Sequence, residues 1–245
     1  MKYTLKLITL AVSTFAVGSL LRAGPPTAAD VGDAESFGHA ALYMGAASGF
    51  IQLEPTCTPA PTPVPPATAN DSQCFALNPA PASSSFSAQD ICRIKLPKKA
   101  TRTIIYPALN FFVDYQLKND TGAPQDPTFF NFSAELVIES DALLDPSIID
   151  PQTGLPANGK LIAGFGYTYR DNRSMQDGDR QRLHETLVRV GNAGINKAAL
   201  VSEGLSQSVV DNLFASAMTI RMNVTGSTKL VTDASITCNM RLFGD

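Results

Sequence analysis

Apolar and polar side chains alternate along much of the chain after position 90. In "DICRIKLP", Cys92, Ile94 and Leu96 share one face while Arg93 and Lys95 share the other. A period of two residues is typical of a half-buried β-strand. The same period recurs in "LNFFVDYQLKN", "FFNFSAELVIES", "KLIAGFGYTYR" and "LHETLVRV", with a shorter run in "SGFIQLEP". These segments predict a succession of strands separated by turns.

One segment near the end of the chain has helical spacing instead. In "SQSVVDNLFAS", Val209, Val210, Leu213 and Phe214 fall on one face of a helix that begins after Ser206, a favourable N-cap. The preceding "NKAALVSE" predicts a further helical turn. The chain then closes with "AMTIRMNVTG" and "KLVTDASITCNMRLF", which predict a terminal hairpin.

Short strands with few helices are typical of an antiparallel β-sandwich. We therefore expect a mostly β fold, a sandwich or jelly-roll-like single domain, with one or two short helices near the C-terminal third. Residues 55–88 hold eight prolines, which neither pair well in sheets nor continue helices. They predict a proline-rich loop within the domain, because residues 30–54 alone are too few to bury a core of their own.

The first 29 residues have the layout of a secretory signal peptide, followed by the single domain at 30–245. Lys2 and Lys6 precede an apolar run over residues 7–21, and Thr27-Ala28-Ala29 offers a small-x-small cleavage site. We expect cleavage after Ala29 and a secreted or periplasmic product. The apolar run is shorter than the roughly 20 residues needed to span a bilayer. No later run is longer, so we expect no membrane span in the mature chain.

Cysteine and charge usage fit this compartment. The four cysteines, Cys57, Cys74, Cys92 and Cys238, predict two disulfides in an exported protein. We favour Cys57–Cys74 and Cys92–Cys238, although the other pairings and free buried thiols stay open. The 19 cations and 22 acids give a net charge of −3. An acidic protein is a poor partner for nucleic acid, whose binding depends on neutralised phosphates.

No motif predicts catalysis, a metal or a cofactor. "GAASG" does not fit the G-x-S-x-G register, and the two histidines, His39 and His184, read as ordinary positions. "RDNRSMQDGDR" offers Asp171, Asp177 and Asp179 as calcium ligands, but its interleaved arginines favour a salt-bridged loop. We expect no cofactor, no metal site and no enzymatic activity.

Two surfaces are candidates for binding. The segment "RIKLPKKATR" carries Arg93, Lys95, Lys98, Lys99 and Arg102, a possible site for anionic glycans, although a solvated charged face is the plainer interpretation. The aromatic row Phe165, Tyr167 and Tyr169 could stack on sugar rings, although a row that faces the core is favoured.

The segments "ADVGDAESFG", "DPQTGLPANGK" and "RLFGD" resemble those of a group of uncharacterised exported bacterial proteins that open with a VGDxxSFG-like segment. The resemblance covers short islands of the chain. It implies a secreted or periplasmic bacterial protein, and it carries no activity and no functional residues.

We therefore expect a non-enzymatic binding or structural protein of the cell envelope or exterior. In its more specific form it is a surface-assembly subunit that donates the segment around "GFIQLE" as a strand to a neighbour's sheet, although pairing of that strand within its own domain is favoured. The expected partners are a second copy of the protein, another envelope protein or a glycan. The alternatives are a hydrolase of envelope polymers with a carboxylate pair, or a glycan-binding module.

Overall fold

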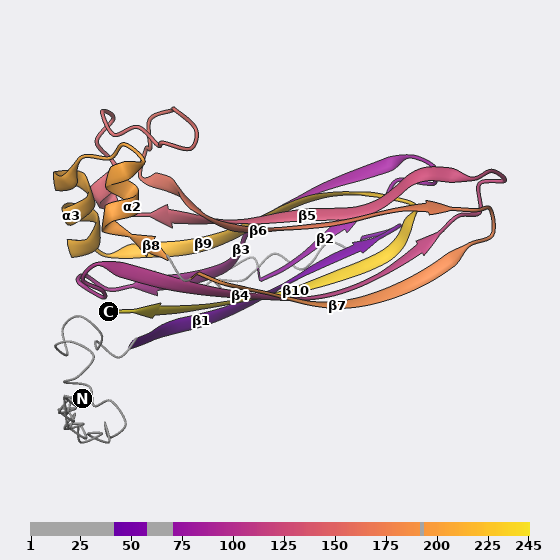
Figure 1. Ribbon diagram of the computed structural model, residues 1–245, viewed down its shortest axis with the longest axis horizontal. Coiled ribbons are helices and arrows are strands. Elements are labelled where there is room, and N and C mark those ends of the chain that lie inside the picture. The colour runs from indigo at the N-terminus through magenta and orange to yellow at the C-terminus, as the bar shows by residue number, and fades with distance from the viewer. Residues whose placement is uncertain (1–41, 58–70, 192–193) are drawn as a thin grey trace, which may run out of the picture. The chain divides into compact units, whose positions relative to one another are not determined.

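The computed structural model describes residues 42–57, 71–191 and 194–245, all of which belong to one compact unit. The predicted signal peptide, its cleavage site, His39 and the VGDAESFG segment lie outside the described residues. The fold is mostly β, as predicted, with two sheets packed face to face (Figure 1).

The first sheet, sheet A, forms the lower layer in Figure 1 and has the strand order β2-β1-β10-β4-β7. The short strand β8 also pairs with β4 in this sheet. Every pairing is antiparallel except that of β1 with β2. The strands are β1 (Leu42–Glu54), β2 (Ser72–Ala76), β4 (Ile104–Lys118), β7 (Arg180–Val190), β8 (Ile195–Asn196) and β10 (Val231–Gly244).

The second sheet, sheet B, has the order β3-β9-β5-β6 and is antiparallel throughout. Its strands are β3 (Ser83–Leu96), β5 (Gln125–Glu139), β6 (Lys160–Met175) and β9 (Met218–Lys229). The two sheets approach closely where β1 meets β3. A Cβ on Gly49 would lie 2.1 Å from the carbonyl oxygen of Ile91, so only glycine permits this approach.

The alternation of apolar and polar residues correctly predicts which side chains form the core. Along β5, the residues Phe130, Phe132, Ala134, Leu136 and Ile138 are all buried, and they face the buried residues of β4 across the sandwich. Aromatic rings join the layers, with Tyr115 stacked on Phe130 at 4.5 Å between ring centroids. The strand "GFIQLE" pairs with β10 and β2 in its own sheet, which is the pairing that the sequence analysis favoured over donation to a neighbour.

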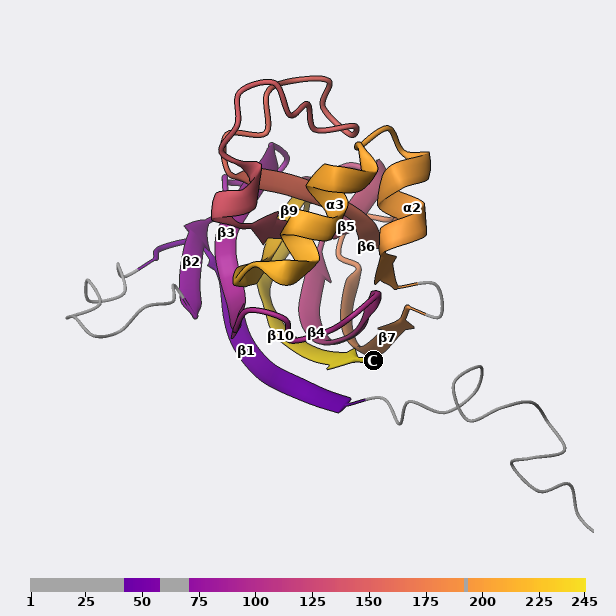
Figure 2. The same cartoon turned by 90° about the vertical axis from the view of Figure 1, so that its left-hand side faces the viewer.

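Both predicted helices are present, and they lie together at one end of the sandwich (Figure 1). They are α2 (Lys197–Ser202) and α3 (Gln207–Ala215), accompanied by a single 3-10 turn, η1 (Asp141–Leu143). Ser206 caps α3 as predicted, with its side chain accepting a hydrogen bond from the Val209 N–H at 3.3 Å. Figure 2 looks onto this end, where Val210, Leu213 and Phe214 of α3 are buried.

Three predicted segments were wrong in extent or pairing. The region 55–88 is not one loop, because β2 and the start of β3 occupy its proline-free parts; residues 58–70 lie outside the described residues. The charged loop after position 170 is largely strand, since β6 runs to Met175 and β7 begins at Arg180. The strands β9 and β10 are consecutive but do not pair as a hairpin. The residue between them, Leu230, has φ of 62°, and the two strands join different sheets.

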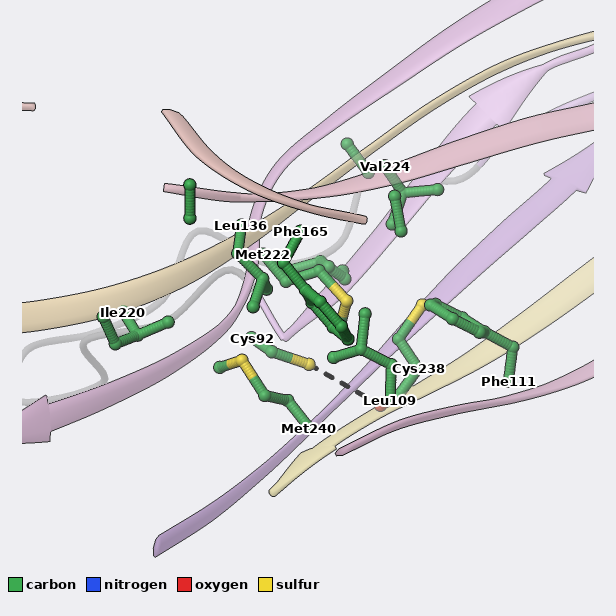
Figure 3. Packing of buried hydrophobic residues seen from close by; sticks show 14 of the residues in the cluster. Cys92, Leu109, Phe111, Leu136, Phe165, Ile220, Met222, Val224, Cys238 and Met240 are labelled. Atoms are coloured by element: carbon green, nitrogen blue, oxygen red, sulfur yellow. Dashed lines mark hydrogen bonds between the residues drawn. The ribbon is translucent and has the colours of Figure 1, made fainter. Parts of the chain in front are cut away.

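The disulfide Cys57–Cys74 is formed as predicted, with 5.6 Å between the Cα atoms. The second predicted disulfide is wrong, because Cys92 and Cys238 are free buried thiols. They lie on β3 and β10, in opposite sheets, and Figure 3 shows the Cys92 sulfur directed at the Cys238 backbone. Its Sγ lies 3.6 Å from the Cys238 carbonyl oxygen rather than being bonded to the second sulfur.

A polar network fills the space between the edge strands β6 and β7. The Tyr115 hydroxyl donates to Asp171 and lies 3.0 Å from the Tyr169 hydroxyl. Arg173 donates from Nε to both oxygens of Asp171 at 2.8 Å, and its Nη1 donates to Gln181 of β7. Burial, followed by the hydrogen bond to Asp171, raises the pKa of Tyr115. The network therefore connects sheet A to sheet B through side chains at the edge strands β6 and β7, where no strand belongs to both sheets.

Candidate interaction surface

The outer face of sheet A presents an apolar surface that no described helix or strand covers. The register places Tyr106, Ala108, Asn110 and Phe112 of β4 on this face, alternating with the buried residues Ile105, Leu109 and Phe111. On the neighbouring edge strand β7, Val188 pairs with Asn110 and Val190 with Ala108. We call the set Tyr43, Tyr106, Ala108, Asn110, Phe112, Val188, Val190 and Phe243 the sheet A patch.

The patch is apolar and accessible. Phe112 is 47% exposed, Val188 59% and Val190 58%. On the β1 side, Tyr43 is 64% exposed and packs edge to face on Phe243, with the ring centroids 5.9 Å apart. Phe243 itself pairs in register with Tyr106, so an aromatic row crosses three strands. A single exposed apolar residue needs no explanation, whereas a contiguous group of them marks a contact surface.

A hollow of about 310 Å³ lies within the patch. It is lined by residues of β4, β7 and β10, among them Asn110, Phe112, Val188, Asn239 and Arg241. The side-chain oxygen of Asn110 is buried at this hollow and accepts no hydrogen bond from the described residues. A buried acceptor without a donor is costly. With less than 1 Å² of accessible surface, this oxygen is out of reach of a donor from another molecule.

Charged residues lie at one border of the patch and are already paired. Asp114 follows Phe112 by two positions on the same face. It forms an ion pair with Arg182 of β7, and its other carboxylate oxygen contacts Nδ1 of His184. Arg182 also pairs with Asp233 of β10 at 2.9 Å. These residues give the patch a polar rim, whereas Arg241 is the charged residue that lines the hollow itself. An apolar centre with an arginine and a polar rim is common in protein interfaces.

The cations predicted as an anion-binding site do not act as one group. Arg93 is half-buried on the outer face of sheet B, where it forms an ion pair with Asp90, to which Arg221 also binds. Burial, and then the charge of Arg221, lower the pKa of Arg93. The other four, Lys95, Lys98, Lys99 and Arg102, are exposed on β3 and the β3–β4 connection. For these four, anion binding stays a prediction.

The other sequence candidates have structural roles. Phe165, Tyr167 and Tyr169 face the core, as favoured, and so do not form a sugar-stacking platform. Asp171 binds Arg173, Asp177 accepts from the Gly122 N–H, and Asp179 accepts from the Gln176 N–H. Among the described residues, Glu54, Cys57 and Cys74 are the one group of possible metal ligands within reach of one another, and its cysteines form the disulfide.

Sequence reasoning missed the sheet A patch, although the sequence contains a signal for it. In "LNFFVDY" two phenylalanines are adjacent, and adjacent residues of a strand point to opposite faces. With Phe111 in the core, Phe112 must lie on the outer face. The same holds for Leu187 and Val188 in "TLVRV".

No protein-family model and no curated protein sequence matches the chain. Solved structures give weak matches. One is a structure of the infectious bursal disease virus Gx strain, with 8% identity over 76% of this chain and 37% of that chain, at a TM-score of 0.18. Another is a mutant VP2 protein of the same virus in T=1 particles, with 8% identity, 76% and 40% coverage and a TM-score of 0.19. At these TM-scores the likeness supports no inference about fold or function.

In the described part of the chain, no helix is both long enough and apolar enough to span a bilayer.

Proposed function

We propose that the protein is a non-enzymatic structural protein of the cell exterior that associates with a second copy of itself through the sheet A patch. The observation that carries the proposal is the exposed apolar group Phe112, Val188 and Val190 on the outer face of sheet A. The patch lies on sheet strands, which hold its residues in a fixed arrangement, as a preformed interface requires.

The chemistry of the patch favours a second copy as the partner. A symmetric dimer places the same patch against itself, so the patch must be self-complementary. The exposed apolar side chains Phe112, Val188 and Val190 meet this condition, because apolar groups pack against copies of themselves without needing a matching charge. The rim carboxylate Asp114 is already paired with His184 and Arg182, so burying the patch leaves this charge with its partners.

The exterior location is part of the proposal. Disulfides persist mainly in oxidising compartments outside the cytoplasm, and Cys57–Cys74 is such a bond. The signal-peptide layout of residues 1–29 supports the same location. The enzyme alternative has less support, because the described carboxyl groups with shifted pKa values, Asp145, Asp211 and Asp245, are all shifted downward. A general acid requires the opposite shift.

Sedimentation velocity over a range of protein concentrations tests the proposal. We expect wild-type protein to form a dimer, and Val188→Lys to shift it to monomer, because a lysine in the apolar contact would have to be desolvated. Thr168→Lys is the matched control, since Thr168 is an exposed strand position on the outer face of sheet B. Wild-type protein that stays monomeric at every concentration, or a Val188→Lys dimer as stable as that of wild type, would refute the proposal.

A further inference from the structure

A second cavity lies at the end of the sandwich remote from the helices. The helices follow β8, which pairs with the first residues of β4, whereas this cavity adjoins Lys118 at the other end of β4. Its volume is about 330 Å³, within the range of small-molecule sites. The β9–β10 turn and the β2–β3 connection form its apolar wall, with Leu77, Pro79, Ala82, Leu230 and Val231.

Two buried hydroxyl groups line this apolar cavity. Ser84 is 4% exposed and Thr228 is 1% exposed, and they are paired in register across β3 and β9. The inward positions that follow in the same direction are apolar or glycine, with Phe86 opposite Gly226 and Ala88 opposite Val224. The hydroxyl pair therefore breaks an otherwise apolar inward row, and it does so where the cavity lies.

The hydrogen bonding of these hydroxyls leaves donors available. The Ser84 oxygen accepts from the Asn78 N–H at 2.7 Å, which leaves its own proton free to donate. Thr228 also lines the cavity, and its hydroxyl can both donate and accept. Hydroxyl groups on the wall of an apolar cavity can donate to an acceptor oxygen placed inside it.

The charge at the rim favours a neutral ligand. Lys118 lines the cavity, but its ammonium group is paired with Asp120. A carboxylate ligand would have to displace Asp120 to gain this cation. A ketone, ester or alcohol oxygen would accept from Ser84 and Thr228 without disturbing that pair.

We propose that this cavity binds a small apolar molecule through one neutral hydrogen-bond-accepting oxygen, which Ser84 and Thr228 recognise. The apolar body of the ligand lies against Leu77, Leu230 and Val231. This binding site is separate from the sheet A patch and does not depend on self-association.

Heteronuclear NMR of the full chain, titrated with methyl octanoate, octanoate and octane, tests the proposal. We expect methyl octanoate to shift the methyl signals of Leu77, Leu230 and Val231, and to bind about tenfold more tightly than octane, which has no oxygen. Octanoate is expected to bind more weakly than the ester. Tighter binding of octanoate would overturn the assignment of a neutral oxygen, and the absence of shifts at these methyl groups would overturn the site.

Variants identify the groups that recognise the oxygen. We expect Thr228→Val and Ser84→Ala each to weaken methyl octanoate binding about five- to tenfold. Their matched controls, Thr225→Val and Ser85→Ala, change exposed positions on the same two strands and should leave binding unchanged. Unchanged affinity in both pocket variants would overturn the role of the hydroxyls.

A third variant keeps the test independent of the buried positions. Ala82 lines the cavity and is exposed, so Ala82→Phe fills the site without altering a buried residue. We expect it to abolish binding while thermal unfolding stays at the wild-type temperature. Binding of the ester at wild-type affinity in this folded variant would place the ligand elsewhere and overturn the proposal.

Discussion

Asn110 of β4 and Val188 of β7 are directly paired in register on the outer face of sheet A. The pair sets an unsatisfied amide oxygen beside a side chain that is 59% exposed. A neighbouring copy would cover the exposed valine, whereas the amide oxygen is already closed off from outside by its own chain.

The thiols of Cys92 and Cys238 should be inert in the folded protein. Burial, followed by the charge of Asp71, raises the pKa of Cys92 to about 12, and burial likewise raises that of Cys238. At pH 8 both groups are therefore protonated, whereas the thiolate is the form that reacts. We expect iodoacetamide to leave the native mass unchanged and to add two groups in guanidinium chloride. Rapid labelling of native protein, or a Cys92–Cys238 peptide in non-reducing maps, would contradict this.

Tyr115→Phe should weaken the link between the sheets. The variant removes the hydroxyl that donates to Asp171 in a fully buried position, and we expect a loss of about 1–3 kcal/mol in the free energy of unfolding. Chemical denaturation at pH 7 measures this loss. Tyr43→Phe, at a position 64% exposed, is the control and should unfold as wild type does.

The same tyrosine should make stability depend on alkaline pH. The pKa of Tyr115 in the folded protein lies above its ordinary value, so its contribution is complete below about pH 10 and is lost as pH rises further. Above that pH the unfolded chain releases the proton that the folded protein retains. We expect a steeper fall in the wild-type unfolding free energy than in that of Tyr115→Phe. Parallel curves for the two proteins would rule out the contribution.

Asp245 should stabilise the β3–β4 connection in its ionised form. Burial acts to raise the pKa of its carboxyl group. Hydrogen bonds from the side chains of Thr101 and Thr103, and from the N–H groups of Thr103 and Ile104, outweigh that effect and lower it. The Arg102 N–H donates to the same carboxylate at 3.0 Å.

A carboxyl group with a lowered pKa contributes stability that is present above its ordinary pKa of about 4 and is lost as pH falls below it. We expect Asp245→Asn to lower the unfolding free energy at pH 7 and to flatten its decline between pH 4 and pH 2. Asp126→Asn, an exposed strand position, serves as the control. An Asp245→Asn curve that follows wild type through this range would exclude the role.

Much of the fold could be predicted from local patterns. The two-residue period in "FFNFSAELVIES" depends only on which side chains are apolar, and it identified the buried face of β5. Ser206 was predictable as an N-cap because capping involves only the next few residues. Cys57 and Cys74 are close in sequence, so their pairing was also a local inference.

The predictions that were wrong concerned contacts between residues far apart in the sequence. Nothing in the spacing of Cys92 and Cys238 shows that their strands lie in opposite sheets with one sulfur directed at the other residue's backbone. The adjacent strands β9 and β10 looked like a hairpin because their separation into two sheets depends on partners far away in sequence. Alternation also shows which residues point outward, but not whether another element covers them, so the exposure of Val188 had to come from the structure.

Photo-crosslinking from Phe112 tests whether the protein self-associates through the sheet A patch. Benzoylphenylalanine placed at Phe112 in the full chain is irradiated, and the crosslinked peptides are identified by mass spectrometry of mixed isotope-labelled and unlabelled protein. The same group at Thr168 on sheet B is the control. We predict crosslinks between copies that join position 112 to outer-face residues of β4, β7 or β10, and none between copies from position 168. Crosslinks confined to one copy, or equal yields from both positions, would contradict the claim.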